Sequence, residues 1–129
     1  MLVKLGIAAV LAASAHTGLY HHKTITLTAA DNGRTVHVTR GEEVRVKLAV
    51  KLKQNPDPTT WWHAVTESGD ALEALPQTLM AMRGVTLGRY RADAKGEATL
   101  TSSRAICPQH PGAPTCHSMQ GWNVTVDVR

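Results

Sequence analysis

The stretch VRVKLAVKLK, residues 44–53, contains the clearest structural pattern in this sequence, because apolar and polar residues alternate along it. Successive side chains of a β-strand point to opposite faces, so this period of two is typical of a strand that buries one face. The polar face would carry Arg45, Lys47, Ala49, Lys51 and Lys53. The buried face would carry Val44, Val46, Leu48, Val50 and Leu52.

The same period recurs in WNVTVDV, residues 122–128, where every second residue is Trp or Val, and in TVHVT, residues 35–39. Weaker strand signals occupy 24–28, 61–66, 88–93 and 97–103, with turn residues between them. The only segment with helical character is 70–83, and Pro76 limits any helix there to one short turn. A chain of 129 residues fits one core. We therefore expect an all-β protein, an antiparallel β-sandwich of seven to eight strands.

The N-terminal residues differ from the rest of the chain. Residues 5–13 are apolar, and Ala13-Ser14-Ala15 follows the small-x-small pattern of a cleavage site. The stretch is too short to cross a bilayer, which takes about 20 apolar residues. The alternative is an apolar strand or helix. We expect an export signal, a secreted or periplasmic (cell-envelope) location and no membrane contact after cleavage. The predicted division is signal peptide 1–15, flexible segment 16–23 and domain 24–129.

Cys107 and Cys116 are the only cysteines. In an exported protein an even pair predicts a disulfide bond. The alternative is a metal pair with His110 or His117, but the spacing contains no CxxC motif.

Charge and motifs exclude several classes of function. The net charge is +4, yet no basic run or base-stacking motif accompanies it, so we expect no nucleic-acid binding. No GxSxG motif surrounds a serine and no carboxylates are paired, so we expect no enzyme activity, no cofactor and no catalytic metal. One alternative is a copper site formed by His16 with His21 or His22.

Two adjacent tryptophans, Trp61 and Trp62, follow the proline-containing turn 54–60. On a strand they would point to opposite faces, so one belongs in the core. The other would face solvent, a second layer or a partner. An exposed Trp beside a rigid loop is typical of an interface hot spot, and the alternative is that the turn 54–60 folds over it.

The order of these features resembles the chagasin-type inhibitors of papain-like cysteine peptidases, over residues 24–129. VTRGEEVRVKL (38–48) is similar to the family's G-x-x-V-x-V-x-L strand. GRYRADAKGEATLTSSR (88–104) and GWNVTVDVR (121–129) are similar to its later strands. The resemblance implies an immunoglobulin-like sandwich in which three loops at one end enter the protease cleft.

The resemblance also implies which residues contact the peptidase. In the first loop, Asn-Pro-Thr-Thr-Gly of the family corresponds to Asn55, Pro56, Thr59, Thr60 and Trp61, with Asp57-Pro58 inserted and Trp in place of Gly. The second loop is 83–88, with Gly84. The third is 104–121, in which Arg104 matches the Arg of the family's Arg-Pro-Trp and Ala105-Ile106 replaces the rest.

These residues predict a monomeric, secreted, reversible inhibitor of papain-like peptidases that blocks the cleft with loops 54–61, 83–88 and 104–121. One alternative is a secreted immunoglobulin-like binding or structural domain without inhibitory activity. A third alternative is a protein that binds copper through its N-terminal histidines.

Overall fold

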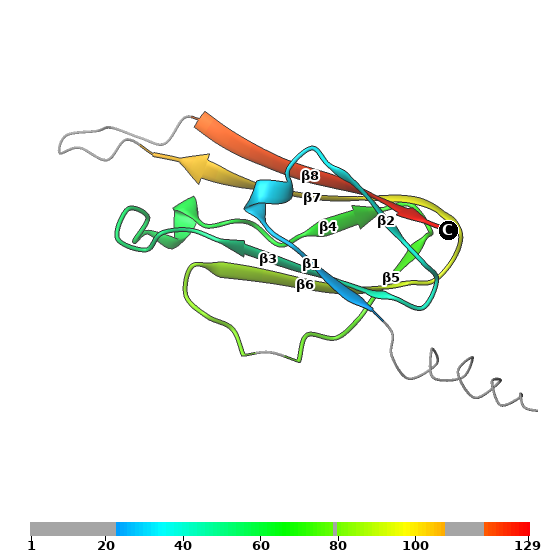
Figure 1. Ribbon diagram of the computed structural model, residues 1–129. Helices are drawn as coiled ribbons and strands as arrows, with labels where there is room; N and C mark the ends of the chain where they lie inside the picture. The colour runs from blue at the N-terminus through cyan, green and yellow to red at the C-terminus, as the bar shows by residue number, and fades with distance from the viewer. Residues whose placement is uncertain (1–22, 79, 108–117) are drawn as a thin grey trace, which may run out of the picture.

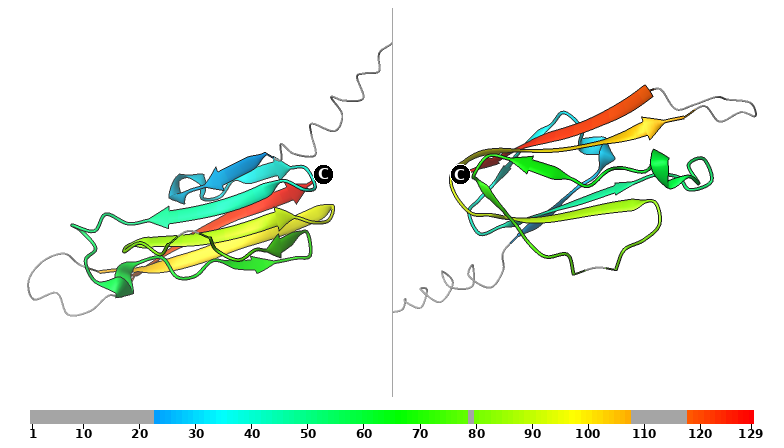
Figure 2. Two further views of the ribbon diagram at one scale, coloured as in Figure 1. Left: turned by 90° about the horizontal axis from the view of Figure 1, so that it is seen from below. Right: turned by 180° about the vertical axis from the view of Figure 1, so that it is seen from behind.

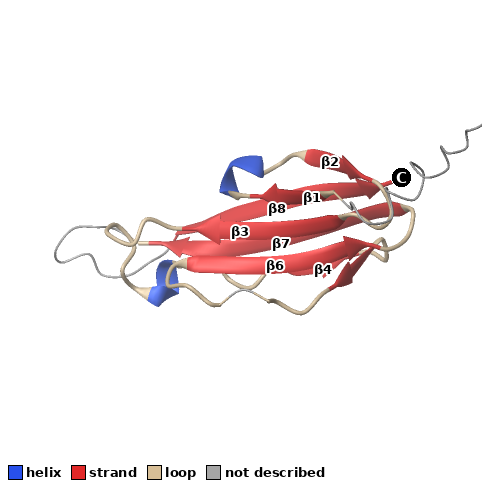
Figure 3. Ribbon diagram, turned by 60° about the horizontal axis from the view of Figure 1, so that its bottom comes forward, coloured by secondary structure: helices blue, strands red, loops and turns tan. Residues whose placement is uncertain are grey.

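The computed structural model describes residues 23–78, 80–107 and 118–129, and strands make up most of it (Figure 3). None of the described residues forms a helix long and apolar enough to cross a membrane. Two single 3₁₀ turns are η1 (Ala29–Asp31) and η2 (Pro58–Thr60). The strands are β1 (Thr24–Leu27), β2 (Thr35–Val38), β3 (Glu43–Ala49), β4 (Thr66–Ser68), β5 (Leu72–Ala74), β6 (Val85–Ala92), β7 (Gly96–Ile106) and β8 (Ser118–Val128).

The strands form two four-stranded sheets, in the orders β1-β3-β6-β5 and β2-β8-β7-β4, stacked as two layers (Figures 1 and 2). The predicted all-β sandwich is therefore confirmed. The expectation that it is antiparallel throughout was wrong, because β1 runs parallel to β3 and β2 runs parallel to β8. The chain crosses from the first sheet to the second between β1 and β2 and then returns with β3. Each of the first two strands thus joins an edge beside a strand of the same direction.

The core lies between the sheets and contains most of the apolar faces predicted from the sequence. Leu52 was predicted to be buried and is 38% exposed, because it follows the end of β3. Val44, Val46 and Leu48 of β3 are buried. The same holds for the alternate residues of β8, Trp122, Val124, Val126 and Val128. Burying one face of each strand is what an alternating sequence requires. The predicted strand 44–53 is too long, because β3 ends at Ala49, where its partner β6 begins with Val85.

Two other segments differ from the sequence predictions. Residues 61–65 form no strand, and only Thr66 of the predicted strand 61–66 belongs to β4. Within 70–83, where the sequence has helical character, Leu72–Ala74 forms β5 and pairs with the edge of β6. Pairing with a distant strand overrides the local preference because it buries Leu72 in the core.

A three-residue ion cluster ties β3 to β6 on the outer face of their sheet. The carboxylate of Glu43 accepts from Arg89 Nε at 2.7 Å and Nη2 at 3.2 Å, and from Arg45 Nε at 2.5 Å. Hydrogen bonds from Arg89 and then Arg45 lower the pKa of Glu43 from 4.5 to about 2. The cluster therefore stabilises the fold while Glu43 is ionised.

We predict that Glu43→Gln lowers the free energy of unfolding at pH 7 by about 1 kcal/mol. The folded-state pKa lies below the unfolded one, so this contribution is complete above about pH 4.5 and is lost as the pH falls toward 2. Urea denaturation of both proteins between pH 7 and pH 3 measures the difference, which should shrink below pH 4.5. A difference in unfolding free energy that does not change with pH would contradict the attribution of this stabilisation to the ionised carboxylate of Glu43.

Candidate functional site

Four strand ends meet at one end of the sandwich, away from the C-terminus (Figures 1 and 2). Here β3 ends beside the start of β6, and β7 ends beside the start of β8. The segments that reach this end are 50–62, 75–84, 104–107 and 118–120, and we call them the loop end. The described parts of the three predicted binding loops thus lie at the same end. Two of them are shorter than predicted: residues 85–88 belong to β6, and 104–106 and 118–121 belong to β7 and β8.

The first loop is closed by hydrogen bonds within itself. Asp57 caps η2, since its Oδ1 accepts from the Thr59 backbone N–H at 3.0 Å, and this bond lowers the pKa of the carboxyl. The Thr60 hydroxyl donates to the Asp57 carbonyl at 2.7 Å, and Thr60 is buried. Trp61 Nε1 donates to the Asn55 carbonyl at 2.8 Å, which joins the two ends of the loop. The loop is therefore shaped before any partner arrives.

The tryptophan pair is divided between the core and this loop. Trp62 is 6% exposed and belongs to the core cluster. Trp61 is half-buried and follows η2 directly, with its indole bonded to the loop. The prediction that one tryptophan of the pair lies in the core is confirmed. The other, Trp61, contacts the turn 54–60 through its bond to Asn55, as the second alternative for it expected.

Arg104 connects the first loop to the hairpin of β7 and β8. Its Nη1 donates to the Asn55 side-chain oxygen at 3.3 Å and to the Thr60 carbonyl at 3.0 Å. Its Nε donates to Gln120 Oε1 at 2.8 Å. Its guanidinium carbon lies 5.7 Å from the centre of the Trp62 ring, within the range of a cation–π contact. Within the chain Arg104 therefore positions the first loop, and its predicted contact with the peptidase stays a prediction.

Gly84 joins the second segment to the first. Its carbonyl accepts from the Val50 N–H at 3.0 Å. Its φ is +74°, and a Cβ there would lie 2.7 Å from Leu52 Cδ2. The left-handed backbone favours glycine, whereas the end of the Leu52 side chain could move aside for a Cβ. Gly84 is buried, so its contribution to the loop end is to packing.

Exposure separates the predicted site residues into two groups. Pro56, Asp57, Pro58 and Thr59 are exposed and form the tip of the first loop. The remaining five shape the loop end, and they are Asn55, Thr60, Trp61, Gly84 and Arg104. Beside them an open groove of about 230 Å³ is lined by Lys51, Asn55, Trp62, Arg104 and Gln120 among others.

The sequence reasoning missed Gln120. Gln120 lies opposite Arg104 in the β7–β8 ladder. In the sequence, Gln120 stands two residues before Trp122 and so lies on the same face of the alternating strand. This position does not reveal its partner, because the pairing register of β7 and β8 is needed to find Arg104.

Several predictions fall on residues that the structure does not describe. The Cys107–Cys116 bridge includes Cys116, and the copper alternative uses His16, His21 and His22; all four lie outside the described residues, as does the predicted signal peptide. These stay predictions. Within 23–78, 80–107 and 118–129, no group of three or more His, Cys, Asp or Glu is placed to hold a metal ion.

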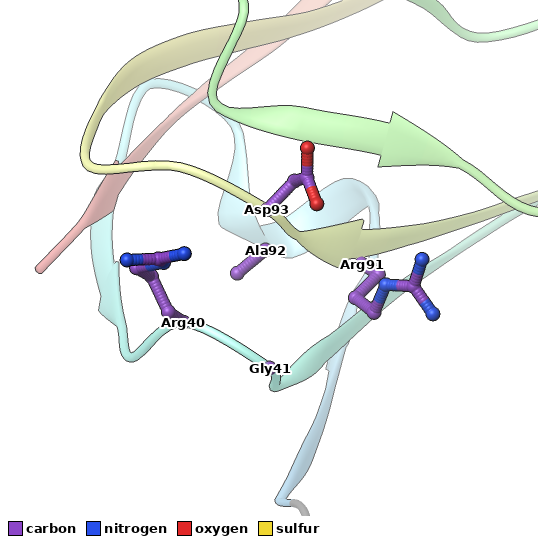
Figure 4. Close-up of a pocket in the computed structure, with 5 residues that line it drawn as sticks. All are labelled: Arg40, Gly41, Arg91, Ala92 and Asp93. Carbon is purple, nitrogen blue, oxygen red and sulfur yellow. The ribbon is translucent and has the colours of Figure 1, made fainter.

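A second hollow lies at the opposite end, with a volume of about 420 Å³ (Figure 4). The guanidinium groups of Arg40 and Arg91 point away from each other, and the carboxylate of Asp93 points in a third direction. Arg91 is already paired with Glu73. These charges do not converge on one point, so this hollow offers no anchored binding site.

Comparisons with known proteins show the fold. No family model matches the chain, and no curated protein matches its sequence. The crystal structure of a cysteine protease inhibitor from Entamoeba histolytica is similar, with a TM-score of 0.56 and 17% identity, over 84% of this chain and 98% of that inhibitor. The solution structure of amebosin is 18% identical over 84% of this chain and 100% of amebosin, with a TM-score of 0.43. The chain thus shares its fold with a cysteine protease inhibitor.

We predict that Arg104→Lys loosens the first loop, because one ammonium cannot reproduce the planar fork that serves three acceptors. The free energy of unfolding should fall by about 1–2 kcal/mol. Hydrogen exchange of the Thr60 and Trp61 amides should become at least several-fold faster. Arg83→Lys is the matched control, since Arg83 is exposed and lies in the neighbouring segment. Equal exchange in both variants would show that Arg104 does not position the loop.

Proposed function

We propose that this chain is a secreted, monomeric and reversible inhibitor of papain-like cysteine peptidases, which inserts its loop end into the active-site cleft. The observation that carries the proposal is the preformed first loop. It is closed by Trp61 and Asp57 and fastened to the β7–β8 hairpin by Arg104. A loop whose shape is fixed before binding loses less conformational entropy on entering a cleft.

The proposed mechanism is steric. Pro56, Asp57, Pro58 and Thr59 are the exposed residues at the tip of the first loop, so they would lie over the catalytic cysteine of the peptidase. The segments 75–84 and 104–107 would contact the cleft on either side. No group of this chain has to react, so the complex would dissociate to intact inhibitor and active enzyme.

The shared fold supports this role without establishing it. The similar structure from Entamoeba histolytica is a cysteine protease inhibitor, and the match spans 98% of that chain. Because one fold hosts many functions, the role has to be argued from the site. The loop end adds support to that argument, since Arg104 bonds to Asn55 of the first loop and Gly84 accepts from Val50, just before that loop.

We predict sub-micromolar, competitive inhibition of papain by the chain purified under oxidising conditions, measured with a fluorogenic peptide substrate. Thr59→Trp should weaken inhibition by a factor of about 10 or more, because it adds bulk at the exposed tip and keeps the backbone bond to Asp57. Arg40→Ala, at the opposite end, is the control and should leave the inhibition constant unchanged. A folded protein that does not inhibit at tens of micromolar would favour the binding domain without inhibitory activity.

A further inference from the structure

The net charge of this protein is concentrated at the loop end. Of the 14 Lys and Arg in the sequence, Lys4 precedes the described residues and nine lie elsewhere in the domain. The remaining four are at the loop end, and they are Lys51, Lys53, Arg83 and Arg104. Of the 10 Asp and Glu, nine lie elsewhere in the domain and only Asp57 is at the loop end. The body of the domain is therefore neutral and its loop end is cationic.

The ion pairs show the same division. The six ion pairs in the described part of the chain all lie outside the loop end, on the strands and near η1. The four cations of the loop end have no carboxylate within 4.0 Å among the described residues, and the bonds of Arg104 go to neutral oxygens. Lys51, Lys53 and Arg83 are exposed. Their charge is thus available to a partner.

Exposed apolar side chains also belong to the loop end. Every large hydrophobic residue that is exposed in the described part of the chain belongs to the loop end, namely Leu52, Met80, Met82, Ile106 and Met119. Met82 is 52% and Met119 is 60% exposed. Exposed apolar side chains accompanied by unpaired positive charge are typical of a protein-binding site. Methionine is unbranched and polarisable, so it adapts to uneven apolar surfaces.

From this charge and apolar distribution we propose that the target is a peptidase with carboxylates around the rim of its active-site cleft and apolar surface inside it. This inference rests on the proposed function and specifies its partner. The lysines and Arg83 attract the acidic rim and set the rate of association. Met82, Met119, Leu52 and Ile106 contact the apolar surface and set the rate of dissociation.

The first test measures association rate constants by stopped-flow inhibition. The probes are a papain-like peptidase with an acidic cleft rim and the same enzyme with its rim Asp and Glu replaced by Asn and Gln. With the acidic rim, the association rate should fall by a factor of about 10 or more between 20 and 500 mM NaCl. With the amide rim it should change much less.

The second test exchanges charges on the inhibitor. The triple variant Lys51→Glu, Lys53→Glu and Arg83→Glu should slow association with the acidic rim by a factor of about 10 or more at 20 mM NaCl. Lys23→Glu, Lys47→Glu and Lys95→Glu change the total charge equally on the body of the domain and are the matched control, with an expected effect below about threefold. Arg104 is kept, because it positions the first loop.

The third test separates the apolar contribution. Met82→Ser with Met119→Ser should raise the dissociation rate by a factor of about 10 and leave association nearly unchanged. The matched variants to Leu should retain slow dissociation.

Two failures are distinguishable. If both peptidases are inhibited at equal association rates that do not depend on salt, the inference of an acidic cleft rim is wrong, while the proposed inhibitor function remains supported. Absence of inhibition of either enzyme by the folded protein would overturn the proposed function and this inference with it.

Discussion

The antiparallel ladder between β7 and β8 is the interaction on which both the core and the loop end depend. It runs in one register from Gly96 opposite Val128 to Ile106 opposite Ser118. Along it, Leu100, Trp122 and Val124 are buried toward the other sheet. A slip of one residue would turn these side chains outward, so the core fixes the register. The same register then sets Arg104 beside Gln120, at the far end of the hairpin.

Arg104 has two consequences for the loop end. Its guanidinium holds the first loop through Asn55 and Thr60. Because these acceptors are neutral, the bonds leave its charge uncompensated. A carboxylate in the place of Gln120 would also hold Arg104, but it would cancel one positive charge on this surface. Arg104 therefore both holds the first loop in shape and adds to the positive potential of this surface.

The fold is similar to that of a known inhibitor although the sequence identity is low, and both facts have one physical explanation. A sandwich needs apolar side chains at alternate positions of its strands, and many different residues satisfy that need. At 17% identity the fold persists. Loops carry no such requirement, and here Asp57 and Trp61 close the first loop by local hydrogen bonds. The proposed function accordingly rests on these loops and their charges.

The sequence by itself determined the strands with a strong period and most of the buried faces of β3 and β8, because alternation is a local property of each strand. It also predicted that one tryptophan of the pair Trp61-Trp62 lies in the core. It also placed the turn that contains Asn55 and Thr60. Only the tertiary structure decided that Leu72 lies in an edge strand, that Gly84 packs on Leu52 and that Arg104 bonds to Asn55, 49 residues away. These contacts join segments far apart in the chain, and packing of the two sheets is what brings them together.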